Sequence, residues 1–65
     1  STLQDSKYFV VKDSNCTIEE ALREFDENHK LLAILFTKHG QINERALGIM
    51  TGRDVTTAQK ILENY

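Results

Sequence analysis

The first half of the chain carries two hydrophobic patterns, a short continuous run followed by a helical periodicity. Residues 8–11 (YFVV) are aromatic and β-branched, and the polar segment KDSNC comes next, which predicts a strand leading into a loop. Thr17 and Glu20 then have the spacing of a capping box at a helix start. After it, apolar residues recur on one helical face, at Ile18, Ala21, Leu22 and Phe25. A strand, a loop and an amphipathic helix are therefore expected.

A six-residue apolar run, Leu31 to Phe36, is compatible with two structures. Its length suits a buried strand, although periodicity alone does not separate a short buried strand from a buried helix. If it is a strand, residues 46–51 (ALGIMT) are its antiparallel neighbour across a turn at His39-Gly40. A second helix then follows with Asp54 as its N-cap. This gives an α+β fold in the order β-α-β-β-α, with a small three-stranded sheet and two helices.

The alternative is an all-α, winged-helix-like architecture in which the apolar run continues the first helix. Residues 43–51 then form another helix, Gly52 the turn, and residues 54–64 the recognition helix of a DNA-binding helix-turn-helix. Gly48 would lie inside a helix at a cost of about 1 kcal/mol. The positive charge of this recognition segment is small, because acidic residues offset its bases and phosphate contacts dominate DNA affinity. Nucleic acid is a partner only under this alternative.

Composition and charge limit the remaining choices. The 65 residues make one domain, 1–65, with a core of about residues 8–64, and a chain this short has a marginal core. The net charge of −2 divides into −4 for residues 1–29 and +2 for residues 30–65, which weakly favours anion binding by the second part. Cys16 is the single cysteine, and no apolar run is long enough to cross a membrane. We expect a cytoplasmic protein without a metal or a bound cofactor.

Two segments resemble the cystathionine β-synthase (CBS) motif, namely TIEEAL at residues 17–22 and GIMTGRDV at residues 48–55. The segments FVVKDSN and TKHGQINERALGI are similar to the CBS module of inosine monophosphate dehydrogenases. The resemblance covers roughly residues 9 to 56 and implies a regulatory role. It also implies that the chain can be a fragment of a larger protein of purine metabolism that is similar to these dehydrogenases. Because CBS motifs usually occur in pairs, it also implies a homodimer or a second CBS motif as partner.

The resemblance assigns a ligand site to the closing motif. Thr51 and Asp54 correspond to a clamp on the ribose and phosphate of a nucleotide such as AMP, ATP or GTP. Arg53 adds a phosphate contact, and Ile49 with the start of the first strand supplies an apolar base pocket. The alternative for the clamp is purely structural, with Asp54 as a helix cap. We expect no catalysis, because no nucleophile lies near a base, and we expect a side chain at Gly48 to crowd the neighbouring backbone.

Overall fold

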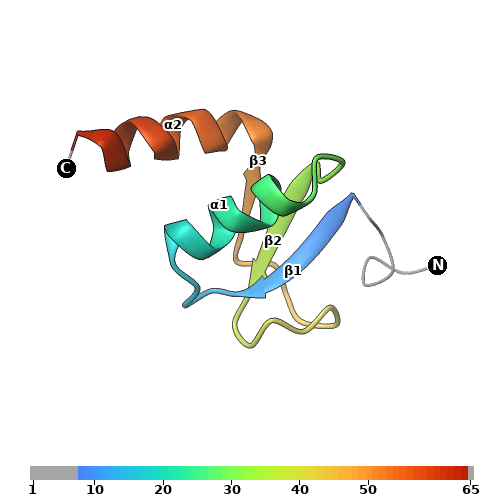
Figure 1. Ribbon diagram of the computed structural model, residues 1–65. Coiled ribbons are helices and arrows are strands. Elements are labelled where there is room, and N and C mark those ends of the chain that lie inside the picture. The colour runs from blue at the N-terminus through green and yellow to red at the C-terminus, as the bar shows by residue number, and fades with distance from the viewer. Residues whose placement is uncertain (1–7, 65) are drawn as a thin grey trace.

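The computed structural model describes residues 8–64 and has the element order β-α-β-β-α (Figure 1). The elements are β1 (Phe9–Asp13), α1 (Ile18–Glu27), β2 (Ala33–Thr37), β3 (Gly48–Thr51) and α2 (Gly52–Glu63). The α+β prediction is confirmed, and the all-helical alternative is wrong. None of the helices within the described range is long and apolar enough to cross a membrane.

The end of α1 explains why the apolar run is a strand. Asn28 has an extended backbone and donates its N–H to the Glu24 carbonyl, which closes the last turn of the helix. The Asn28 carbonyl then accepts from the Leu31 N–H at 3.1 Å, and its side-chain oxygen accepts from the Lys30 N–H at 3.1 Å. These bonds hold a turn that reverses the chain. The helix therefore cannot continue into Leu31–Phe36.

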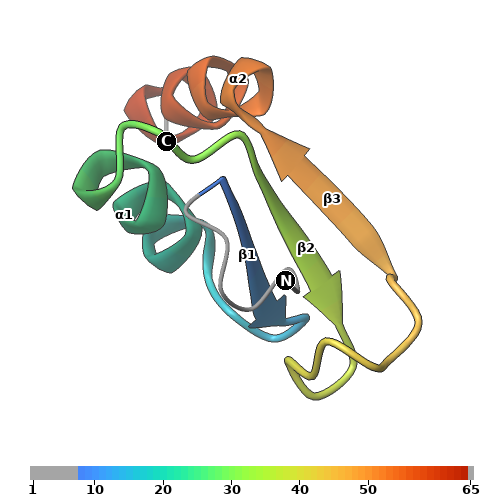
Figure 2. The ribbon, with the colours of Figure 1, turned by 90° about the vertical axis from the view of Figure 1, so that its right-hand side faces the viewer.

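The sheet has the strand order β1-β2-β3, with β2 in the middle (Figure 2). β1 and β2 are parallel, as α1 requires by crossing over between them, and β3 runs antiparallel to β2. Phe9 is in register with Ala33, which is in register with Thr51. One end of the sheet therefore combines the starts of β1 and β2 with the end of β3.

α1 begins at the predicted capping box. The Thr17 hydroxyl accepts from the Glu20 N–H at 3.1 Å, and the Glu20 carboxylate accepts from the Thr17 N–H at 2.8 Å. The Thr17 N–H, together with the Thr17 hydroxyl, which donates to the same carboxylate at 3.1 Å, lowers the pKa of Glu20. The two residues together satisfy donors that would otherwise lack a partner at the helix start.

The core lies between α1 and one face of the sheet. Ile34 on the central strand is fully buried, and Ala21 of α1 and Leu31 pack against it. The cluster is completed by half-buried residues from the strands, α1 and the loop between β1 and α1, namely Val10, Cys16, Phe25, Phe36 and Met50. α2 contacts both α1 and β3, so the two helices form one layer (Figure 1). At the margin of this layer, Lys12 Nζ lies 3.2 Å from Glu24 Oε2.

The opposite side of the sheet carries apolar side chains that neither helix covers. Side chains alternate between the two faces of a strand, so the neighbours of Val10, Ile34 and Met50 point away from the helices. We call this surface the open face, and its apolar members are Phe9, Val11, Leu35 and Ile49. Ile49 is 60% exposed, and the other three are half-buried. The fold thus leaves a strip of apolar surface in contact with water.

Gly40, within the β2–β3 loop, and Gly48, the first residue of β3, differ in whether a side chain would fit there. Gly40 has φ +74°, and a Cβ there would lie 3.1 Å from the Asp13 backbone nitrogen. A Cβ on Gly48 would meet only the Phe36 ring, at 4.0 Å. The expectation of backbone crowding at Gly48 is therefore wrong. Gly40 is the glycine that the fold needs, because both its conformation and its close approach exclude a side chain.

We expect Gly40→Ala to lower the free energy of unfolding by about 1–2 kcal/mol, the cost of a left-handed backbone for an alanine. Gly48→Val is the matched control and should change it by less than about 1 kcal/mol, since valine favours strands and finds room there. Urea unfolding followed by circular dichroism measures both. A larger loss for Gly48→Val than for Gly40→Ala would contradict this packing.

Candidate functional site

The junction between β3 and α2 holds three of the four predicted site residues. The chain passes from strand to helix without a linker, and Thr51 has an extended backbone and is the N-cap of α2. One oxygen of Asp54, Oδ2, accepts from the Thr51 N–H at 2.9 Å and from the Thr51 hydroxyl at 3.2 Å. The prediction that Asp54 is the N-cap is therefore wrong. Asp54 is the third residue of α2, because the helix begins at Gly52, directly after the strand.

The structure brings Thr51 and Asp54 into direct contact and places the other two candidates beside them. Arg53 is exposed on the first turn of α2. Ile49 comes two residues before Thr51 on the same strand, so both side chains point to the open face of the sheet. Ile49 is in register with Leu35, and Thr51 with Ala33. Ile49, Thr51 and Asp54 thus lead from the open face to the start of α2, with Arg53 on the same helical turn as Asp54.

An aromatic residue lies at the same end of the sheet. Phe9 and Thr51 flank Ala33 in one row, about 10 Å apart by two interstrand spacings. The Tyr8 carbonyl accepts from the Leu32 N–H at 2.7 Å, which ties the start of β1 to the start of β2. Both Tyr8 and Leu32 are more than half exposed. An aromatic side chain therefore lies at the same end of the sheet as the Thr51–Asp54 pair, with β2 between them.

This surface has donors and acceptors suited to a sugar phosphate. An ionised Asp54 carboxylate has a second oxygen and further lone pairs that can accept from sugar hydroxyls. The N–H groups of the first residues of a helix have no carbonyl partner within the helix, and they point toward the space in front of its N-terminus. Arg53 adds a positive charge on the same turn. The arrangement suits binding of an anionic, hydroxyl-bearing ligand.

Sequence reasoning missed a second polar centre, in the loop between β2 and β3. Glu44 Oε1 accepts from the Thr37 hydroxyl at 3.0 Å, the His39 N–H at 2.9 Å and the Gln41 N–H at 3.0 Å. Its other oxygen, Oε2, lies 2.7 Å from His39 Nδ1. Desolvation raises the pKa of this carboxyl, but the bonds from Gln41, His39 and Thr37 outweigh it and lower the pKa to about 2. No spacing rule identifies such a cluster, because the loop itself creates it.

Comparison of the chain with models of protein families, with curated proteins and with solved structures gave no match. The likeness to CBS motifs therefore rests on the quoted segments alone. It stays a prediction for the identity of the chain and for its ligand.

The hydrogen bonds to the Glu44 carboxylate should make the free energy of unfolding depend on pH. Because the pKa of Glu44 is about 2 in the folded chain and ordinarily 4.5, its contribution to stability is complete above pH 4.5 and is lost as the pH falls toward 2. Glu44→Gln should remove this contribution, so the difference in unfolding free energy between parent and variant should shrink between pH 5 and pH 2. Glu27→Gln, at an exposed acid on the last turn of α1, is the control. A difference that does not depend on pH would contradict the assignment.

Proposed function

We propose that the chain is a regulatory module that works as a pair and binds a purine nucleotide at the end of the sheet where β3 meets α2. The partner is a second copy of the chain or another unit of the same fold. The ligand is AMP, ATP or GTP, and the module senses it without catalysing a reaction. The observation that carries this proposal is the register that joins Phe9, Ala33 and Thr51 in one row beside Asp54.

The open face supports pairing. Val11, Leu35 and Ile49 form a row across all three strands, and all three side chains are uncharged and apolar. Contiguous apolar surface of this kind marks a contact site. A domain of this size also has a small core, so covering the row adds to its stability. A partner with the same face satisfies both needs, because an isologous contact places like surfaces together.

The β3–α2 junction supports nucleotide binding. Thr51 and Asp54 already bond to each other, so the pair is fixed before any ligand arrives, and a preorganised site loses less entropy on binding. Phe9, on β1 across Ala33 of the central strand, offers an aromatic side chain for a base at the same end of the sheet. The closing motif GIMTGRDV supplies the resemblance to CBS motifs, which implies the nucleotide as the ligand class.

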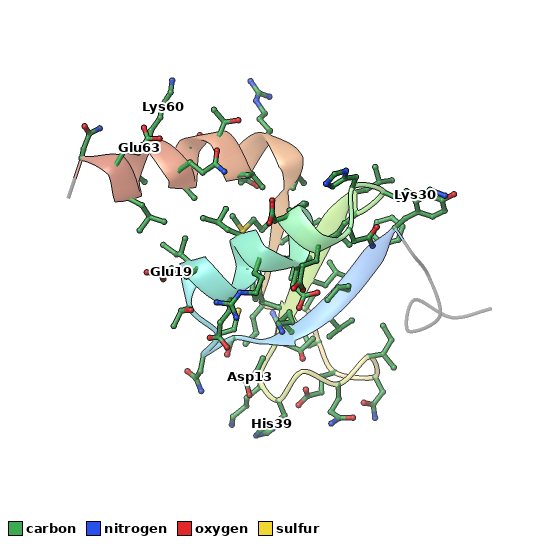
Figure 3. All side chains as sticks on the ribbon, viewed as in Figure 1. Asp13, Glu19, Lys30, His39, Lys60 and Glu63 are labelled. Carbon is green, nitrogen blue, oxygen red and sulfur yellow. The ribbon has the colours of Figure 1, made fainter. Side chains whose placement is uncertain are left out.

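Recognition of DNA through residues 54–64 has no comparable support. That hypothesis needed a helix-turn-helix, whereas α2 follows directly from β3. Lys60 and Glu63, both near the end of α2, are labelled in Figure 3 and carry opposite charges. A nucleotide site is therefore the function that we propose.

Ile49→Lys tests the pairing. A lysine in the middle of the apolar row would bring two like charges into a symmetric contact, so we expect the variant to sediment as a monomer at micromolar concentration while the parent sediments as a dimer. Ile61→Lys is the control, because Ile61 is also exposed but lies on α2, outside the open face. A folded parent chain that stays monomeric would refute the pairing, as would equal effects of both variants.

Asp54→Asn tests the nucleotide site. Asparagine keeps the shape of aspartate but loses the charged acceptor, so we expect AMP, ATP or GTP to bind about tenfold more weakly, as the loss of one charge-assisted hydrogen bond implies. Titrations followed by amide chemical shifts measure the affinities, with Asp26→Asn on the exposed side of α1 as the control. Duplex DNA is titrated in parallel. A paired chain that shows no saturable response to any nucleotide would exclude this site.

A further inference from the structure

The β2–β3 loop has the geometry of an oxyanion receptor. Two backbone N–H groups, of His39 and Gln41, converge on one point, and Gly40 between them has the left-handed conformation that aims neighbouring amides toward a common acceptor. The Thr37 hydroxyl donates to the same point, and Thr37 is 2% exposed. His39 Nδ1 completes the set. Four groups that can donate therefore surround one small volume.

That volume is filled by a carboxylate from the same chain. Both oxygens of Glu44 are engaged, and its side chain is 23% exposed. The low pKa of Glu44, about 2, is what a site that favours a negative charge produces. Lys38 and Arg45 are exposed residues of the same loop, which therefore carries two positive charges in its sequence. This centre and the β3–α2 junction lie at opposite ends of the sheet. In Figure 3 the labels of His39 and Asp13 mark the end that holds the centre.

We propose that the β2–β3 loop is an oxyanion-binding site that Glu44 occupies as an internal ligand, and that a carboxylate or phosphate group from outside the chain competes with Glu44 for the same donors. Entry of the external group displaces the Glu44 side chain, while Thr37, His39 and Gln41 stay as its partners. The internal carboxylate therefore inhibits the site.

Because Glu44 is part of the same chain, the external anion must reach a high concentration before it displaces the Glu44 side chain. A ligand on a short link has an effective concentration in the millimolar range or above, so a free anion that binds these donors as tightly as the Glu44 carboxylate must exceed that concentration to displace it. Removing the Glu44 carboxylate abolishes the competition and leaves the buried Thr37 hydroxyl without its acceptor, at a cost in stability. An added anion can restore that acceptor.

The test uses Glu44→Ala with acetate, phosphate and chloride at matched ionic strength, followed by the amide shifts of His39 and Gln41 and by thermal unfolding. We expect saturable shifts of both amides in the variant, with at least tenfold weaker binding by the parent chain. Acetate and phosphate distinguish a carboxylate from a phosphate ligand, and chloride controls for ionic strength. The parent controls for the general stabilisation that phosphate gives any folded protein.

A second variant separates the site from an effect of charge alone. Glu44→Ala with Thr37→Val lacks one donor, so anion binding should weaken about tenfold relative to Glu44→Ala. If Glu44→Ala is unfolded in dilute buffer, acetate or phosphate should refold it where chloride does not. Linear shifts without saturation, equal responses in parent and variant, or no recovery of an unfolded variant would each overturn the proposal. None of these results depends on nucleotide binding at Thr51 and Asp54.

Discussion

The packing of α1 on one face of the three-stranded sheet is the constraint from which the other features of this chain follow. Ile34 on the central strand is buried because α1 covers it, with Ala21 and Leu31 as its neighbours. Side chains alternate along a strand, so Leu35, the next residue of β2, faces the other side of the sheet, which neither α1 nor α2 covers. Burial of one face and exposure of the opposite one are two results of the same arrangement.

The two ends of the sheet have separate chemistry because the central strand runs between them. Ala33, at the start of β2, lies beside Thr51 and the helix start that follows it. Thr37, at the end of β2, donates to Glu44 in the loop before β3. In both places a carboxylate organises the local backbone, Asp54 through Thr51 and Glu44 through His39 and Gln41. These local bonds hold strand ends that a core of this size supports only weakly.

The first helix cap could be predicted from sequence because it depends on a local signal, whereas the local pattern of Leu31–Phe36 fitted a strand and a helix equally, and only the resemblance to CBS motifs favoured the order β-α-β-β-α. The Thr17–Glu20 capping box and the Gly40 turn are local signals, and both occur in the structure. The start of α2 was misplaced by three residues because Thr51 and Asp54 each suit an N-cap, and sequence alone does not say where β3 ends. The Glu44 centre was missed because it depends on how the β2–β3 loop packs, and the free space at Gly48 was missed because it depends on where the Phe36 ring of the paired strand lies. The first helix cap, formed by residues close in sequence, could be predicted, whereas contacts that depend on the conformation of the β2–β3 loop could not.

Pairing through the open face is the central claim, and contacts between two differently labelled copies test it most directly. Equal amounts of chain labelled with carbon-13 and unlabelled chain are mixed, and nuclear Overhauser effects that cross from one copy to the other are selected. The account predicts such effects between the Ile49 and Leu35 methyl groups of one copy and the Val11 side chain of the other, because these residues form one row on the open face. A folded chain whose intermolecular effects come only from α2, or are absent altogether, would contradict it.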